Sequence, residues 1–322
     1  MIQNRYSERT RGGLALLIVV VAATMTPLTA HARNEEPARG LLGLERADSA
    51  LTNMVATERA FSALSVERGM REAFLHFLAD DGVVFQPLAV NGKEAWRARA
   101  ASPATLIWEP GHGEMASAGD LGWSSGPWEY RPPSDSTGAP PPANRIAHGH
   151  FISVWARQPD EQWRVVLDMG ISHPPPERGL GNIEFKPKPA HTWMAGQNNP
   201  KSRANLAEID RRYARDAKKL GAAALDVWAT TDVRLNREGE YPTEGRDSAK
   251  TALLTAAAIV RLLPHGSRVS MSDDLGYTYG ILERASSRGA APDSSTYLHI
   301  WRREADRNWR IAVIVENPLP PR

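Results

Sequence analysis

The pattern of apolar and polar positions is clearest in two stretches near the ends of the chain, residues 148–170 and 295–317. Each stretch alternates with period two, passes a tryptophan, crosses a polar segment and resumes its alternation at a second tryptophan followed by arginine. Alternation on both sides of a polar turn predicts a β-hairpin with one buried face. The returning strands should each present a wholly apolar face, formed by Trp163, Val165, Leu167 and Met169 and by Trp309, Ile311, Val313 and Val315.

Apolar residues at helical spacing come earlier in the chain. In residues 45–68 they fall near one face of a helix, Gly69 interrupts the pattern, and residues 70–78 resume it until an Asp-Asp-Gly sequence stops it. Asn91, with Glu94 three residues later, is typical of a helix N-cap. We therefore expect two helices and then a shorter third one.

Strands are predicted on both sides of that short helix. They are expected at residues 83–85, 106–108, 114–118 and 121–130. Gly119 and Asp120 should form a two-residue hairpin turn between the last two strands. Residues 131–147 are rich in proline, serine and glycine and predict a long loop.

The second half of the chain repeats this order of elements. Asn205 and Glu208 form an N-cap pair like the first one, and a helix is predicted for residues 247–262. The offset between matching residues is 155 for Leu51 and Leu206, 154 for Asp120 and Asp274, and 146 for Trp155 and Trp301. A slowly changing offset is expected of a duplicated domain whose loops differ in length.

The predicted organisation is two domains behind a leader. A chain of 322 residues exceeds a typical single domain. We expect the domains at residues 45–175 and 204–322, joined by a linker rich in proline and glycine at residues 176–203.

The leader has the features of an export signal. Residues 1–32 carry a basic start, an apolar run at residues 14–23 and an Ala-x-Ala sequence that ends at Ala32, which predicts a signal peptide cleaved after Ala32. The apolar run is about half of the roughly 20 residues that a membrane-spanning helix needs. The chain contains no cysteine, so it has no thiol for a lipid anchor or a disulfide. We expect a periplasmic or secreted protein without a membrane span after cleavage.

The charge balance gives no indication of a nucleic-acid partner. The chain has 39 basic and 37 acidic side chains, and the leader takes away three arginines and one glutamate. The exported chain is therefore close to neutral, and its lysines and arginines form no clustered stripe. We expect no nucleic-acid binding.

Several short motifs accompany this order of elements. They are Glu58-Arg59-Ala60-Phe61 with Gly69, Asp80-Asp81-Gly82-Val83, Asn91-Gly92-Lys93-Glu94, Trp108-Glu109-Pro110, Gly119-Asp120-Leu121-Gly122-Trp123, and Val154-Trp155 with Trp163-Arg164. With them the chain resembles the SnoaL-like, ketosteroid-isomerase-related branch of unknown function in the nuclear transport factor 2-like superfamily. The resemblance covers residues 45–175 well and residues 204–322 more loosely.

The resemblance implies an α+β fold of two tandem cone-shaped domains, each with N-terminal helices packed on a strongly curved antiparallel sheet. Members of the superfamily use the cone for isomerisation, dehydration, epoxide hydrolysis, cyclisation or plain binding, so the fold alone does not choose a function. Many relatives dimerise through the outer face of the sheet. The resemblance therefore implies either a pseudo-dimer of the two domains or a homodimer.

An enzyme of this class needs a carboxylate or histidine that can transfer a proton. Relatives often carry histidine on the last strand, where this chain has Leu167 and Met169 in the first copy and valine in the second. The remaining candidates are His150, His112, Glu109 and Asp168. If Trp163 points into the cone, alternation sends Asp168 to the outer face of the sheet.

Neither a metal nor an organic cofactor is expected. His148 and His150 share one face of a strand, but a metal site needs more than two ligands and no third one follows at a recognisable spacing.

The first copy is unusually rich in tryptophan, which suits a pocket with an apolar body and one polar end. The expected ligand-binding residues are Trp96, Trp108, Trp123, Trp155 and Trp163. The favoured hypothesis is an exported binding protein that holds a small apolar or aromatic molecule in the first cone. One alternative is a cofactor-free lyase or isomerase that uses His150 or His112 with Glu109 or Asp168, and another is a non-catalytic interaction scaffold.

Overall fold

The computed structural model describes residues 32–134, 139–176, 183–188, 204–286 and 292–320, with side chains described from residue 45 onward. All but the last residue of the predicted leader, and most of the predicted linker at residues 176–203, lie outside these described residues. Among the described helices, none combines the length and apolar character that a bilayer crossing needs.

The first half of the chain forms three helices and a sheet. Its elements are α1 (Ala32–Arg68), α2 (Met70–Phe77), β1 (Leu78–Gln86), β2 (Leu88–Asn91), α3 (Gly92–Ala98), β3 (Thr105–Trp108), β4 (His112–Met115), β5 (Leu121–Arg131), β6 (Ala147–Arg157), β7 (Trp163–His173) and β8 (Lys186–Pro187). The strands lie in the order β2-β1-β7-β6-β5-β4-β8, and β3 also pairs with β5. We call this the first sheet.

The second half forms a similar set of elements. They are α4 (Leu206–Leu220), α5 (Leu225–Trp228), β9 (Ala229–Arg237), β10 (Thr243–Glu244), α6 (Arg246–Leu253), β11 (Ile259–Val269), β12 (Leu275–Arg284), β13 (Asp293–Arg303) and β14 (Trp309–Pro318). The second sheet has the order β10-β9-β14-β13-β12-β11. The protein is thus a mixed α+β structure with two separate sheets and few helices.

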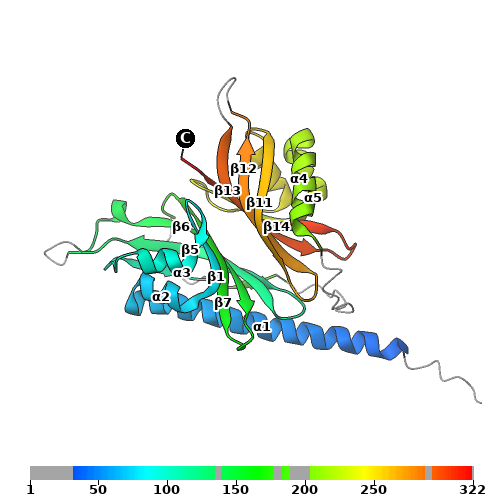
Figure 1. Cartoon of the computed structure of the whole chain (residues 1–322), viewed down its shortest axis with the longest axis horizontal. Helices are drawn as coiled ribbons and strands as arrows, with labels where there is room; N and C mark the ends of the chain where they lie inside the picture. The colour runs from blue at the N-terminus through cyan, green and yellow to red at the C-terminus, as the bar shows by residue number, and fades with distance from the viewer. Residues whose placement is uncertain (1–31, 135–138, 177–182, 189–203, 287–291, 321–322) are drawn as a thin grey trace, which may run out of the picture.

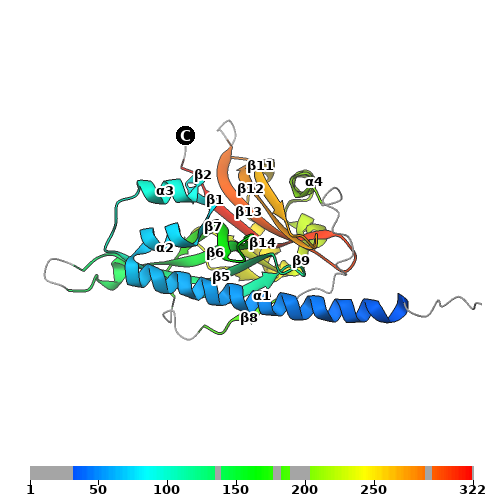
Figure 2. The same ribbon diagram turned by 60° about the horizontal axis from the view of Figure 1, so that its bottom comes forward.

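Each sheet packs its own helices on one face. In the first half, α1 and α2 cover the sheet over a core that includes Phe61, Phe74 and Trp155. In the second half, α4 packs on β11 and β12 over a core that includes Tyr213 and Trp301. The helices therefore lie on the outer sides of the molecule, and the N-terminal part of α1 extends beyond both sheets (Figures 1 and 2).

The faces without helices pack against each other. A third apolar cluster joins residues of both sheets, among them Ile152 and Leu167 from the first and Leu298 and Val313 from the second. Burial of apolar surface on both sheets makes this contact part of the folded core rather than a loose junction.

The loops beside this contact exchange hydrogen bonds. Asp120 accepts one at Oδ2 from the backbone N–H of Met271 at 2.9 Å, and Asp274 accepts one at Oδ2 from the N–H of Ser117 at 2.9 Å. Asp120 and Asp274 are 154 residues apart in the sequence, and so are their partners' positions, Ser117 and Met271. Reciprocal contacts of this kind are what a twofold-symmetric interface makes. The sequence analysis gave Asp120 only a role in a turn and did not predict this contact.

A β-bulge in β7 contradicts one prediction. Val165 and Leu167 lie opposite adjacent residues of β6, so Val166 is an extra residue in the ladder. Trp163 and Val165 consequently pack in the core beneath the helices, whereas Leu167 and Met169 pack between the two sheets. The prediction that these four side chains share one face is wrong, because one added residue reverses every later position of a period-two strand.

The same bulge occurs in β14. The register of β13 and β14 shifts between Ile311 and Val313. Trp309 and Ile311 belong to the core beneath the helices, and Val313 and Val315 belong to the core between the sheets. The face predicted for the second returning strand is therefore wrong for the same reason.

Both helix N-caps predicted from the sequence are present in the structure. The Asn91 side chain accepts from the N–H of Glu94 at 3.0 Å, which confirms the predicted N-cap. The Asn205 side chain does the same for Glu208 at 3.2 Å.

Two predictions of local structure failed. The helix predicted for residues 247–262 ends at Leu253, and strand β11 begins at Ile259, because pairing with β12 buries Ile259 in the core. The turn at Gly119 and Asp120 is also longer than two residues, since β4 ends at Met115.

Candidate functional site

A cavity of about 170 Å³ lies between the helices and the first sheet. Its wall is mostly aromatic and includes Phe61 of α1, Phe74 of α2, Trp108 of β3, Trp128 of β5 and Phe151 of β6. Its polar side chains are Ser153 of β6 and Asp168 of β7. An apolar wall with a few polar groups is the usual make-up of a small-molecule site.

Asp168 reaches the cavity because of the bulge. Simple alternation from Trp163 would place its side chain on the outer face of the sheet, and the sequence analysis expected it there. The extra residue at Val166 instead turns Asp168 toward the helices, where it lines the cavity and meets Ser153 Oγ at 3.4 Å. The expected outward position of Asp168 is therefore wrong.

Glu58 of α1 is a second buried carboxyl beside this site. It is fully buried and accepts hydrogen bonds from Trp108 Nε1 at 2.7 Å, Ser124 Oγ at 2.6 Å and Trp155 Nε1 at 2.7 Å. Three donors from three strands hold this carboxyl in one position. Hydrogen bonds of this kind favour the ionised form of a carboxyl and offset part of the cost of burial.

The two carboxyls affect each other's ionisation. Burial raises the pKa of Asp168 to about 7, the charge of Glu58 adds to this rise, and only the long hydrogen bond from Ser153 opposes it. Burial also raises the pKa of Glu58, against the effect of its hydrogen bonds to Ser124, Trp108 and Trp155. Burial therefore favours the neutral, protonated form of both carboxyls, and Asp168 has fewer hydrogen bonds than Glu58 to oppose it.

The structure separates the five tryptophans that the sequence grouped as ligand-binding. Trp108 lines the cavity, and Trp155 lies beneath it as a donor to Glu58. Trp96 stacks on Phe74 with ring centres 4.2 Å apart, so it supports the wall from behind. The last two do not reach the cavity.

Trp163 is part of the core beneath the helices, and Trp123 lies on the opposite face of the sheet, between the two sheets. Trp128, which was not among the expected residues, lines the cavity instead. Its ring lies over Gly149, where a Cβ atom would approach the indole to 2.4 Å. The glycine therefore makes room for this part of the wall.

Three of the four acid–base candidates lie away from the cavity. Glu109 forms an ion pair with Arg59 at 2.7 Å near the surface. His150 Nδ1 lies 2.8 Å from His173 Nε2, and burial together with the charge of Arg234 lowers its pKa to about 3. Only Asp168 among the four candidates lines the cavity.

His112 also lies far from this cavity, at the edge between the sheets. Burial, with a further effect of Arg234, lowers its pKa to about 4. Within the described residues, no group of three or more His, Asp or Glu side chains is arranged to hold a metal ion.

The second half uses the corresponding positions differently. The offset of the last strands places Ile314 where the first half has Asp168, and His299 where it has Ser153. His299 is buried with Asp210, whose Oδ1 lies 2.8 Å from the ring Nδ1, and Tyr297 donates its hydroxyl to Asp210 Oδ2 at 2.7 Å. Tyr213 borders a cavity of only about 30 Å³.

Sequence reasoning did not select Glu58 or Asp210 as functional residues. Both lie on the buried stripe of their helix, Glu58 between Val55 and Phe61 and Asp210 between Leu206 and Tyr213. An acidic residue on an apolar helix face is the signal that could have revealed them, because buried carboxyls are rare unless they are paired.

The comparisons with known proteins give similarity in fold only. No family model and no curated protein matches the sequence. Similar solved structures include a ketosteroid isomerase-like protein from Erwinia carotovora atroseptica SCRI1043, with 18% identity over 36% of this chain and 95% of that one and a TM-score of 0.29.

Two other structures are similar to a like extent. A putative ketosteroid isomerase from Parabacteroides distasonis ATCC 8503 has 19% identity over 39% of this chain and 98% of that one, with a TM-score of 0.30. An NTF2-like protein with a cystatin-like fold from Novosphingobium aromaticivorans has 17% identity over 36% of this chain and 81% of that one, with a TM-score of 0.29. The structural neighbours are thus NTF2-like and ketosteroid isomerase-like proteins at low identity.

Proposed function

We propose that the cavity of the first half binds a small, largely apolar molecule about the size of a single ring, and that Asp168 forms a hydrogen bond with its one polar group. The observation that supports this most directly is a carboxyl group on the wall of a cavity that is lined mostly by apolar and aromatic side chains. Its volume of about 170 Å³ compares with roughly 150 Å³ for a protein cavity that binds benzene.

The protonation state of Asp168 favours a neutral ligand. With a pKa of about 7, the carboxyl carries a proton in mildly acidic solution and can both donate and accept a hydrogen bond. An anionic ligand would lose its hydration in a cavity whose lining residues include no basic side chain. Phenols and cyclic ketones have the required size and a single polar group.

A second candidate is proton transfer by Asp168 on the bound molecule, as in a cofactor-free lyase or isomerase. A pKa near 7 is what favours this candidate, because a general acid or base works best when its pKa lies near the working pH. Glu58 is less suited to this transfer, since its own oxygens are occupied by three donors.

We further propose that the chain is exported and that its two halves act as an internal pseudo-dimer. The leader sequence supports export. The reciprocal hydrogen bonds of Asp120 and Asp274 support the pseudo-dimer.

Calorimetric titration with benzene, phenol and cyclohexanone tests the binding proposal. Phenol or cyclohexanone should bind roughly three- to tenfold more tightly than benzene, as expected for one net hydrogen bond. The difference should vanish in Asp168→Leu and persist in Asp160→Asn, whose side chain lies in the exposed β6–β7 turn. Equal affinities of all three compounds in the wild type would contradict the role of Asp168.

Asp168→Asn separates binding from catalysis. Asparagine keeps a hydrogen-bonding group of the same size but cannot transfer a proton. NMR measures how fast the α-hydrogens of cyclohexanone exchange with deuterium. If Asp168 acts as a base, this exchange should be faster with the wild-type protein than in buffer. Asp168→Asn should then bind the ketone without accelerating the exchange. Binding without accelerated exchange in the wild type would reject catalysis on this compound.

A further inference from the structure

The edge between the two sheets carries a cluster of basic groups on the side away from the ring-sized cavity. His112 of β4 and Lys188, just after β8, come from the first half, and Arg234 of β9 comes from the second. Glu244 of β10 lies directly opposite Arg234 in the ladder of β9 and β10. Both halves of the chain therefore contribute to one polar cluster.

A single oxygen atom lies at the centre of this cluster. Glu244 Oε1 is 3.5 Å from Arg234 Nη1, 3.6 Å from Lys188 Nζ and 3.6 Å from His112 Nδ1. Charge-assisted hydrogen bonds between such groups are typically about 2.7–2.9 Å long. The carboxylate is thus surrounded by two cationic groups and the imidazole of His112 but held closely by none of them.

Several donors at this place are buried and unused. Only 8% of the Arg234 side chain is exposed, and within the described residues its Nε has no hydrogen-bond partner. Ser125 Oγ is fully buried and has no hydrogen-bond partner among the described residues. Ser125 lies directly opposite His112 in the ladder of β4 and β5. His112 Nδ1 also makes no hydrogen bond to any described residue. Buried donors normally have partners, since leaving one unpaired costs about 1–3 kcal/mol.

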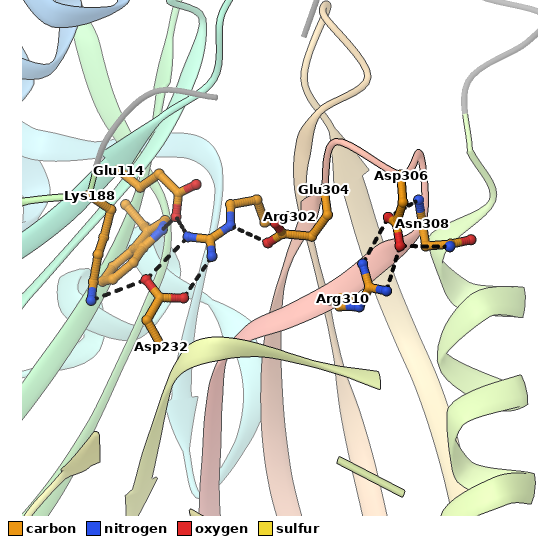
Figure 3. Close-up of polar contacts among 9 residues, drawn as sticks. Glu114, Lys188, Asp232, Arg302, Glu304, Asp306, Asn308 and Arg310 are labelled. Atoms are coloured by element: carbon orange, nitrogen blue, oxygen red, sulfur yellow. Dashed lines mark hydrogen bonds and ion pairs between the residues drawn. The ribbon is translucent and has the colours of Figure 1, made fainter. Parts of the chain in front are cut away.

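The neighbouring acidic groups are already engaged. Asp232 binds Arg302 Nη2 at 2.6 Å and Lys188 at 3.3 Å, and Arg302 also reaches Glu114 at 3.5 Å (Figure 3). Arg302 also pairs with Glu304 at 2.9 Å (Figure 3). Burial raises the pKa of Glu114 to about 7, against the effect of Arg302. Without Glu244, the Arg234 guanidinium would have no acidic side chain within 4 Å among the described residues.

We propose that Arg234, His112 and Lys188 form a binding site for a small oxyanion, a phosphate or carboxylate group, and that the Glu244 side chain occupies this site when no ligand is bound. The Glu244 side chain is 44% exposed, so it can turn into solvent and leave the space of one carboxylate. An incoming oxyanion has no backbone tether and can approach the Nε of Arg234 and the hydroxyl of Ser125 as well. This site is separate from the aromatic cavity, which lies on the other face of the first sheet.

The opposing interpretation is a plain ion-pair cluster that joins the two halves. In that case removal of the Glu244 charge would create no affinity for anions. If Glu244 instead competes with a ligand, its removal frees the site and tightens the binding by the reciprocal of the fraction of time for which Glu244 had left the site free.

The proposal is tested by titrating the purified full chain with inorganic phosphate and, separately, with acetate. Chloride at equal ionic strength is the reference for each titration. We expect weak binding to the wild type and binding roughly tenfold tighter to Glu244→Gln. Preference for phosphate or for acetate then identifies the group that the site accepts. Glu240→Gln is the matched control, because Glu240 belongs to the same hairpin but pairs with Arg237 at 3.3 Å; its affinity should equal that of the wild type.

A second variant tests the arginine without removing its charge. Adding Arg234→Lys to Glu244→Gln should weaken anion binding at least about tenfold, because lysine lacks the planar fork of donors. Near-ultraviolet circular dichroism checks that this double variant is folded. The proposal is overturned if neither anion binds Glu244→Gln more tightly than the wild type, or if the folded double variant binds as well as Glu244→Gln.

Discussion

The buried Asp168 carboxyl should make the protein less stable as the pH rises, and Asp168→Asn should remove this effect. The pKa of Asp168 rises from 3.8 to about 7 on folding, chiefly through burial. Between these values the folded protein keeps a proton that the unfolded chain has lost, so the free energy of unfolding falls as the pH increases through this window. The loss is complete by about pH 8, one unit above the folded pKa.

The size of the effect follows from the pKa shift. At about 1.4 kcal/mol per pKa unit, the shift corresponds to at most about 4 kcal/mol, and water in the cavity would reduce it. Asparagine has nearly the same shape but no charge to bury. The variant should therefore match the wild type near pH 4 and exceed its stability by a growing margin up to about pH 8.

Urea-induced unfolding at a series of pH values, followed by circular dichroism, measures this difference. Glu114, whose pKa is also raised to about 7 by burial, contributes a slope of the same sign to both proteins, so it cancels in the comparison. Asp160→Asn removes an exposed carboxyl and should give a curve parallel to that of the wild type. If the curve for Asp168→Asn is parallel as well, Asp168 is not a buried carboxyl and both of its proposed roles fail.

Three further outcomes are expected. Trp108→Phe keeps the ring in the cavity wall but removes a donor to the buried Glu58, which should cost about 1–3 kcal/mol in the free energy of unfolding by urea. Gly149→Ala should lower the melting temperature and weaken ring binding, because its Cβ would lie 1.9 Å from the backbone oxygen of Ile171 and 2.4 Å from the Trp128 ring, and overpacking of a core costs about 1–3 kcal/mol or more. Mass spectrometry of the protein recovered from a periplasmic or culture fraction should find Arg33 at the N-terminus, whereas an intact leader would contradict export.

The sequence predicts those parts of the fold that depend on neighbouring residues. The N-caps at Asn91 and Asn205 need only a side chain and an N–H three residues away, and both form as expected. The predicted helix at residues 247–262 shows the limit. Its alanine-rich sequence favours a helix locally, but pairing with β12 draws residues from Ile259 onward into the sheet.

The candidate site was harder to predict because its parts come from distant places in the chain. Glu58 meets Trp108 and Trp155, which are 50 and 97 residues away. No local sequence pattern indicates that Glu58 is hydrogen-bonded to these two tryptophans. The choice among the five tryptophans failed for a similar reason, since Trp123 lies in a strand whose two faces are both buried and nothing in its own segment tells which face adjoins the cavity.

The bulges in β7 and β14 decide which side chains of the last strands face the helices. Without them, the side chain at position 168 would enter the core between the sheets, where a carboxyl would have no access to a ligand. With them, the same backbone presents Asp168 to a cavity in one half and Ile314 to an apolar core in the other. A single substitution at this position therefore changes the chemistry of the site while the sheet contact between the halves, formed by Leu167 and Val313, stays apolar. For this reason we expect the chemistry to reside in the first half, although the bulge itself is common to both.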